Sequence, residues 1–167
     1  MNNNLIIEKL SSSHELDKFD CEQKALNGYL SKYALINQKM RISVTYLALK
    51  GPDIVGFYSL ASGSVRHEDA PKKAKRGLPQ YDIPILLLAR LAVDKKEKGK
   101  GIGSGLLKDS MLRALNASKE FGVRALLVHA KDNNAVEFYK RFDFDPSPIN
   151  PKHLFLTIKD IEKNLSP

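Results

Sequence analysis

Cysteine is nearly absent from this chain of 167 residues, which contains it once, at Cys21. A lone thiol cannot form an internal disulfide, and it has no partner for a cysteine-based metal site. We therefore expect no metal ion, and we expect Cys21 to be a small, half-buried apolar side chain.

Long apolar runs are also missing. The longest, residues 83–89, is interrupted by Pro84 and is far shorter than the roughly 20 residues that a membrane-spanning helix needs. The start, Met1 to Asn4, does not look like a signal peptide. No repeat or low-complexity segment is visible, and the length suits one domain. We expect a cytoplasmic protein with no membrane partner and a single domain over residues 1–167.

Acidic residues are too few to balance the basic ones. The sequence has 19 Asp and Glu against 27 Lys and Arg, which gives a formal net charge of +8. Such a surplus favours a polyanionic partner. A cofactor with a few phosphates needs fewer cations than this, so nucleic acid is one interpretation and a merely soluble basic surface is the other.

The spacing of apolar residues predicts a mixture of strands and helices. Strands are expected at 5–7, 43–49, 54–65, 83–93, 125–129 and 154–158, and helices after Ser11–Ser13, at 22–37, from 102 to before Gly122, and at 134–141. Residues 43–65 are predicted to form a hairpin, residues 67–81 a long loop, and residues 83–93 a strand buried on both faces. This order indicates a layered α/β (α+β) domain.

A glycine-rich turn follows the predicted buried strand and begins a helix: Lys98-Gly99-Lys100-Gly101-Ile102-Gly103. A helix N-terminus presents unpaired N–H groups and a partial positive charge, and glycines let a pyrophosphate approach closely. The turn lacks the Gly-Lys-Ser/Thr ending of a Walker loop, and Ser104 stands where the dinucleotide pattern needs glycine. The pattern predicts a phosphate site of another kind; the alternative is a turn with solvated lysines.

These residues resemble the signature Gln/Arg-x-x-Gly-x-Gly/Ala of the Gcn5-related N-acetyltransferase (GNAT) family, with Lys98 in the Gln/Arg place. A second block, 135–144, resembles the family's A-x-x-F-Y-x-x-x-G-F pattern, with Asp143 in place of glycine. The resemblance implies a central mixed, mostly antiparallel sheet flanked by helices, and acetyl-CoA as co-substrate. The implied cofactor contacts are Leu91, Ala92, Val93, Lys98, Gly99, Lys100, Gly101, Ile102, Gly103 and Ser104.

Three further segments, 19–21, 26–30 and 90–94, are similar to the acetyltransferase toxins of bacterial toxin–antitoxin pairs, which acetylate the amino group of aminoacyl-tRNA and block translation. This resemblance implies aminoacyl-tRNA and a ribbon-helix-helix type antitoxin as partners, and a homodimer. A tRNA would also account for the net charge, because it is bound largely through its phosphates. The candidate tRNA contacts are Arg90, Lys72, Lys73, Lys75, Arg76, Lys39 and Arg41.

Arg90 interrupts an apolar strand, so its charge must reach solvent, a carboxylate or a phosphate. Tyr139 would be a core aromatic by periodicity alone, but the second family block implies that it is the general acid that protonates the departing CoA thiolate.

The central strand lacks an acidic residue, whereas lysine acetyltransferases of this fold tend to have a glutamate there. An α-amino group has a pKa near 7.7–8.0, against about 10.4 for lysine, and so is appreciably neutral near pH 7 without a base. The strand therefore favours an α-amino acceptor.

Two other functions stay open from the sequence. One is acetylation of a small amine or a protein N-terminus, which would use the same cofactor residues. The other is a catalytically silent binding module, against which Tyr139 and the three glycines argue. Asp94 is expected to form a turn, and His67 and His129 are expected to be structural or solvated.

Overall fold

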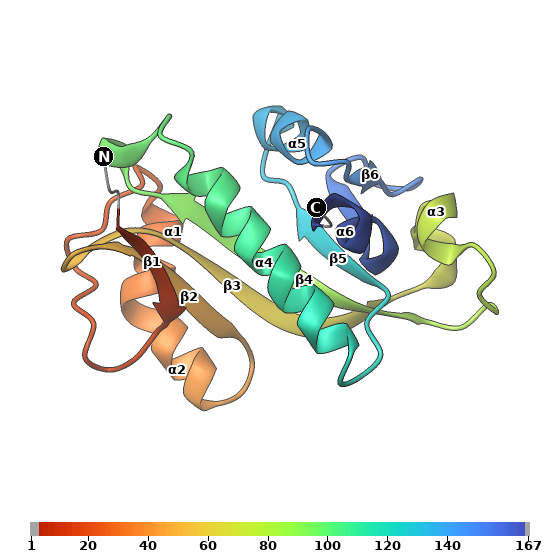
Figure 1. Ribbon diagram of the computed structural model, residues 1–167, viewed down its shortest axis with the longest axis horizontal. Helices are drawn as coiled ribbons and strands as arrows, with labels where there is room; N and C mark the ends of the chain where they lie inside the picture. Colours follow the sequence, from red (N-terminus) through yellow and green to blue (C-terminus); the bar gives the residue numbers. More distant parts are fainter. Residues whose placement is uncertain (1–3, 166–167) are drawn as a thin grey trace. The chain divides into compact units, whose positions relative to one another are not determined.

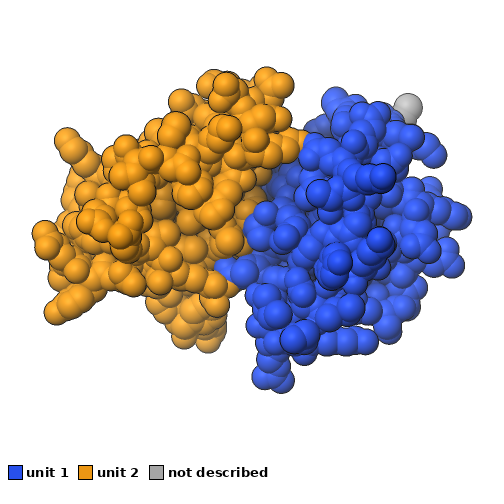
Figure 2. Space-filling view, turned by 180° about the vertical axis from the view of Figure 1, so that it is seen from behind, with its two compact units in different colours: residues 1–61, 89–110 blue, residues 62–88, 111–167 orange. Residues whose placement is uncertain are grey.

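The computed structural model describes residues 4–165. The chain divides into two compact units. Unit 1 combines the chain up to residue 61 with residues 89–110, and unit 2 combines residues 62–88 with the chain from residue 111 onward (Figure 2).

The strands form one sheet in the order β1-β2-β3-β4-β5-β7-β6 (Figure 1). They are β1 (Leu5–Lys9), β2 (Val44–Lys50), β3 (Asp53–Val65), β4 (Ile83–Val93), β5 (Ala125–His129), β6 (Asp145–Pro146) and β7 (His153–Thr157). The ladders β1–β2, β2–β3, β5–β7 and β6–β7 are antiparallel, and β4–β5 is parallel. The predicted mixed, mostly antiparallel sheet and the predicted hairpin of residues 43–65 are confirmed.

The helical segment of unit 1 contains a π-helical turn. It runs through α1 (Lys24–Gly28), the π-helical η1 (Tyr29–Tyr33) and α2 (Ala34–Lys39). A π-helical turn holds an extra residue, so it shifts the phase of the side chains that follow. Tyr29 and Leu30 are buried, whereas Tyr33 and Ile36, which the 3.6-residue spacing placed on the same face, are more than half exposed. The helix was predicted correctly, but its predicted buried face was wrong at Tyr33 and Ile36, whereas Ala34 is buried as the spacing predicts.

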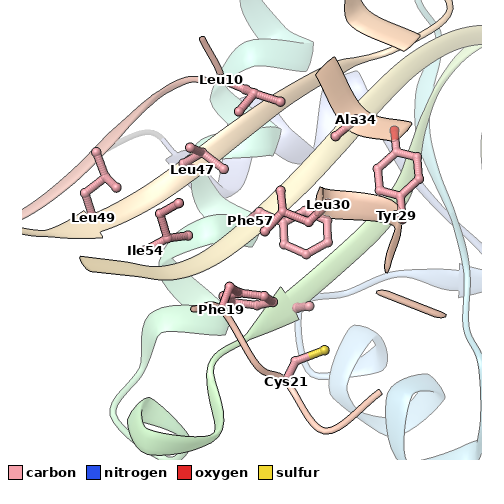
Figure 3. Close-up of a cluster of buried hydrophobic side chains, with 11 residues drawn as sticks. Leu10, Phe19, Cys21, Tyr29, Leu30, Ala34, Leu47, Leu49, Ile54 and Phe57 are labelled. Carbon is pink, nitrogen blue, oxygen red and sulfur yellow. The ribbon is translucent and has the colours of Figure 1, made fainter. Parts of the chain in front are cut away.

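The core of unit 1 lies between this helical segment and strands β2 and β3 (Figure 3). Its members are Leu10, Phe19, Cys21, Tyr29, Leu30, Ala34, Leu47, Leu49, Ile54, Phe57 and Ala92. Phe57 makes ring contacts with Phe19, edge to face, and with Tyr29, stacked. Cys21 is 3% exposed, so it is a fully buried side chain and not a half-buried one.

No helix follows Ser11–Ser13, contrary to the prediction from their N-cap chemistry. The Ser11 hydroxyl lies 2.8 Å from that of Ser13 and 3.3 Å from the His14 ring, and the Ser11 backbone N–H donates to the same ring. These local hydrogen bonds stabilise a turn, which is the usual alternative to a cap for serine.

Unit 2 has its own core, around β5 and β7. Residues 67–81 are not a plain loop, because they contain the 3₁₀ turn η2 (His67–Asp69) and the short helix α3 (Lys72–Lys75). The Arg124 side chain fixes α3 by donating to the carbonyls of Ala74 and Arg76. Helix α6 (Ile158–Leu165) was not predicted; Thr157 begins it, accepting a hydrogen bond from the Asp160 N–H, and Ile161 is buried.

Helix α4 (Ile102–Ser118) begins in unit 1, where it packs on β3 at Gly56. A Cβ on Gly56 would lie 2.8 Å from the Leu106 side chain and 3.0 Å from the Ala92 carbonyl oxygen. Only glycine allows this approach, and it fixes the start of α4. No helix within residues 4–165 is both long and apolar enough to cross a membrane.

Candidate active site

Asp94 organises the loop between β4 and the glycine turn. It begins the 3₁₀ turn η3 (Lys95–Glu97), where its Oδ1 accepts a hydrogen bond from the Lys96 N–H at 2.9 Å. Its Oδ2 accepts another from the Asp20 N–H at 3.1 Å, and the side chain is buried. The prediction that Asp94 forms a turn is confirmed.

Asp20 ties the N-terminal segment to the same loop. Its carboxylate accepts hydrogen bonds from the Glu22 N–H and the Asn27 amide, at 2.8 and 3.0 Å, and pairs with Lys95 at 3.0 Å. The Glu22 hydrogen bond first, then those from Asn27 and Lys95, lower the pKa of Asp20 to about 2. The three segments that resemble the toxins, 19–21, 26–30 and 90–94, therefore contact one another in unit 1. They order the loop that precedes the glycine turn.

The glycine turn adopts backbone angles that suit glycine. Gly99 and Gly101 have φ values of 79° and 83°, in the left-handed region. No heavy atom lies within 4 Å of a Cβ built on either glycine, so the space beside them is open. The Gly105 N–H donates to the Gly101 carbonyl at 3.0 Å, which makes Ile102 the first residue of α4.

Three backbone N–H groups at the start of α4 therefore have no acceptor within the helix, those of Ile102, Gly103 and Ser104. Together with the partial positive charge of the helix end, they suit an anion such as a pyrophosphate.

The lysines of the turn are held by carboxylates. Lys98 lies 3.5 Å from Glu22, and Lys100 lies 3.2 Å from Glu97, which also pairs with Lys50 at 2.7 Å. Lys50 first, and Lys100 second, lower the pKa of Glu97. Lys98 and Lys100 are each about half exposed, so these pairs are weak and the lysines can turn to a phosphate at little cost.

Strand β4 changes character along its length. Its parallel ladder to β5 runs from Ile85 to Leu88. The following residues, Ala89 to Leu91, are half-buried, so the predicted burial on both faces is wrong for this part. Solvent therefore reaches part of these residues, as an arm of acetyl-CoA would require.

Arg90 lies over the ring of Tyr29, with its guanidinium carbon 3.7 Å from the ring centroid. The sequence offered solvent, a carboxylate or a phosphate as its partner; the aromatic face was not foreseen.

Tyr139 lies in unit 2, on helix α5 (Asn133–Lys140). Asp132 begins this helix by accepting a hydrogen bond from the Ala135 N–H. Tyr139 is 8% exposed and packs against the rings of Phe138 and Phe144. Burial raises the pKa of its phenol to about 12, so the group carries its proton at neutral pH. A general acid must meet that condition.

Asp143 stands where the GNAT pattern has glycine. Its φ is 68°, the left-handed conformation that glycine adopts without strain and that aspartate tolerates better than most residues. The backbone after α5 thus keeps the glycine geometry, and the Phe144 N–H still donates to the Tyr139 carbonyl.

The predicted tRNA contacts fall into two groups. Unit 1 carries Arg90, Lys39 and Arg41, the last two exposed at and just after the end of α2; unit 2 carries Lys72, Lys73, Lys75 and Arg76 on and after α3. Lys73 pairs with Asp160 at 2.8 Å.

A cavity of about 960 Å³ in unit 2 is lined by Lys73 and Arg76 and by three basic residues that the sequence analysis did not single out, Arg124, Lys159 and Lys163, together with the acidic Asp160 and Glu162. No signal in the sequence links them, because α3 and α6 are more than eighty residues apart.

The two histidines of β5 and β7, His129 and His153, stack at 3.9 Å in unit 2. Burial first, and His153 second, lower the pKa of His129, which keeps it neutral. His129, which was expected to be structural or solvated, is exposed in the structure and stacks on His153. No group of three or more metal-binding side chains occurs within residues 4–165.

Comparisons with known protein families, sequences and structures all find acetyltransferases. The family model of the acetyltransferase (GNAT) domain matches residues 41–146. A tRNA-acetylating toxin of Mycobacterium tuberculosis is 43% identical over 152 residues, which cover 91% of each chain. AtaT complexed with acetyl-methionyl-tRNAfMet aligns with a TM-score of 0.90 and 29% identity, covering 97% of this chain and 99% of that one. A tyrosine-to-phenylalanine mutant of AtaT, bound to the C-terminus of the antitoxin AtaR and acetyl-CoA, aligns with a TM-score of 0.84 and 28% identity, covering 98% and 99%.

Proposed function

The chain belongs to the GNAT acetyltransferase family, and from that membership we propose that it transfers the acetyl group of acetyl-CoA to the α-amino group of aminoacyl-tRNA and so blocks translation as a toxin. One observation carries the acceptor: the 43% identity with a tRNA-acetylating toxin extends over 91% of the chain. The GNAT fold itself is confirmed by the likeness to AtaT.

The glycine turn is the proposed site of the CoA pyrophosphate. The N–H groups of Ile102, Gly103 and Ser104 would donate to it, Gly99 and Gly101 would let it approach, and Lys98 and Lys100 would add charge. The backbone of Leu91, Ala92 and Val93 would hold the pantetheine arm and the thioester oxygen; Leu91 and Val93 are half-buried, and Ala92 is buried. AtaT with acetyl-CoA supports this choice of co-substrate.

Tyr139 is the proposed general acid. As the amine nitrogen bonds to the acetyl carbon and the carbon–sulfur bond breaks, the phenol gives its proton to the departing sulfur. A pKa of about 12 makes complete transfer to a thiolate, whose acid has a pKa near 8.5, uphill by roughly 5 kcal/mol. The acylated nitrogen must therefore lose one proton in the same step, and that proton returns to the Tyr139 oxygen, directly or through water, so that the phenolate does not accumulate.

The acceptor needs no carboxylate base on β4, which has none between Ile83 and Val93. An α-amino group with a pKa near 7.7–8.0 is about half neutral at pH 8 without a base. We further propose that the whole chain, 1–167, is one acetyltransferase domain, that it forms a homodimer in the cytoplasm, and that a ribbon-helix-helix type antitoxin neutralises it. AtaT bound to the antitoxin AtaR supports the antitoxin.

The acceptor is tested by following transfer from labelled acetyl-CoA to charged tRNA at increasing salt. We expect kcat/KM for tRNA to fall steeply, because many phosphates are neutralised, and acetyl-CoA affinity to fall less. Neutralising Lys72, Lys73, Lys75 and Arg76 together should raise KM for tRNA, whereas Lys9→Ala, an exposed lysine of β1, should not. Transfer to small amines or protein N-termini alone, with no transfer to tRNA, would refute the proposal.

The pH profile is a separate test of the mechanism. Because the pKa of Tyr139 is raised to about 12, its protonated form persists through the whole alkaline range that can be measured. We expect kcat/KM to rise with pH through the amine pKa near 8 and then to stay level up to about pH 10. Short reaction times are needed, because the aminoacyl ester hydrolyses in base. A fall below pH 9 would contradict a buried phenol as the acid.

A further inference from the structure

Arg90 has an unusual partner for a cation in an apolar strand. Its guanidinium lies over the face of Tyr29, 3.7 Å from the centroid. Among residues 4–165, no carboxylate pairs with it, whereas Lys73, Lys98 and Lys100 are each held by an acid. The aromatic face compensates for part of the water that the half-buried Arg90 loses.

Tyr29 is itself firmly held. The side chain is 6% exposed, and its ring stacks on Phe57 at 6.3 Å, at the edge of the core cluster of unit 1 (Figure 3). Its hydroxyl lies 3.0 Å from that of buried Ser43. The ring is fixed by Phe57 and by the hydrogen bond of its hydroxyl, so it is a rigid platform for the Arg90 guanidinium that lies over its face.

A guanidinium stacked on a ring keeps its N–H groups available. The five donors of arginine point outward in the guanidinium plane, so an aromatic face holds the group without using them. A carboxylate partner would occupy two of these donors. The arrangement therefore suits an arginine that is held in place in the free protein and donates to an anion when one arrives.

We propose that Tyr29 is a positioning residue that holds Arg90 as a ready two-pronged donor for a phosphate of the acceptor tRNA; this inference rests on the proposed function. Arg90 immediately precedes Leu91–Val93, the segment assigned to the thioester. A phosphate bound by Arg90 would thus be close along the strand to the reacting group. Tyr29 does not touch the substrate and acts through Arg90.

The test compares variants of Tyr29 with and without Arg90, measuring kcat and KM for methionyl-tRNA, and Kd for acetyl-CoA and for uncharged tRNA. Tyr29→Phe retains the ring and should keep KM and Kd for tRNA within about twofold. Tyr29→Leu removes the ring and should raise both by about 3- to 30-fold, with kcat and acetyl-CoA affinity unchanged. In an Arg90→Ala background, Tyr29→Leu should have no further effect on tRNA.

Equal tRNA affinity for wild type and folded Tyr29→Leu would overturn the inference, as would an effect that is additive with Arg90→Ala. Because Tyr29→Leu leaves a cavity in the core, Arg90→Lys is a second variant that leaves the core intact. It retains the charge but lacks the flat guanidinium that stacks on the ring, and it should weaken tRNA binding several-fold. Wild-type tRNA affinity in the Arg90→Lys protein, which lacks the guanidinium fork, would also overturn the inference. The Kd for uncharged tRNA does not depend on acetylation. A wild-type protein that binds tRNA without acetylating it would therefore refute the proposed function but not the role of Tyr29 in tRNA binding.

Discussion

The Tyr139→Phe protein is expected to fold, to bind acetyl-CoA with wild-type affinity, and to turn over about 10²–10⁴-fold more slowly. The change deletes one hydroxyl and leaves the ring contacts with Phe138 and Phe144 in place. If that hydroxyl supplies the proton, its removal should slow only the chemical step of acetyl transfer. Steady-state kinetics and a growth assay check this, since cells that express the variant should escape arrest.

Tyr58→Phe is the matched control. Tyr58 is fully buried, and its hydroxyl donates a hydrogen bond to Asp109 between β3 and α4. This variant should lose stability, by about 1–3 kcal/mol, because a buried hydrogen bond to a charged group is broken, but it should keep kcat at its wild-type value. Near-normal turnover of folded Tyr139→Phe would assign the proton to solvent or to another residue, and the acetyltransferase assignment would still stand on the glycine turn.

Gly101→Asp is expected to abolish acetyl-CoA binding in calorimetry. Gly101 has a φ of 83°, and the space where its Cβ would lie is open, so a carboxylate could be accommodated there only beside the proposed pyrophosphate. Like charges at that distance cancel the attraction of the helix end. Gly101→Asn has nearly the same shape without the charge, and it should bind more tightly than Gly101→Asp.

Gly51→Asp is the control that separates the effect of backbone strain from the effect of a negative charge beside the pyrophosphate. Gly51, in the turn between β2 and β3, also has a left-handed φ, 57°, and also has no heavy atom within 4 Å of a built Cβ. The Gly51→Asp variant should lose about as much folding stability as Gly101→Asp, and its affinity for acetyl-CoA should be unchanged. Lys98→Ala should lose only about 1–2 kcal/mol of binding, because the backbone donors remain. Unchanged affinity in folded Gly101→Asp would remove the phosphate from this turn.

Local patterns in the sequence were enough for the long helices and for every strand except the two-residue β6, which was not predicted. Ala125–His129 and Ile83–Val93 were predicted with the observed bounds, because each is a short apolar run bounded by turn residues. The π-helical turn at Tyr29–Tyr33 was not predicted, because the 3.6-residue spacing of apolar residues carries no sign of one extra residue in a turn. Helix α6 is short, and its stability comes from burying Ile161 rather than from a long apolar pattern.

The candidate site was predictable where its chemistry is written in consecutive residues, as in the glycine turn and the block around Tyr139. The partners that hold these residues are distant in sequence. Asp20 reaches Asp94, and Tyr29 reaches Arg90, only after the chain has folded. Neither periodicity nor composition indicates such pairs. Asp94 and Arg90 could therefore be singled out from the sequence, but their partners, Asp20 and Tyr29, could not be identified.

The tie between the Asp20 N–H and the Asp94 carboxylate joins positions that are 74 residues apart. Contacts of such long sequence separation form late in folding, because a large loop must close first. A nascent chain still emerging from the ribosome therefore lacks the organised loop that precedes the glycine turn until β4 has been synthesised and has met the N-terminal segment. A transferase that acetylates aminoacyl-tRNA would in this way stay inactive while it is still being synthesised.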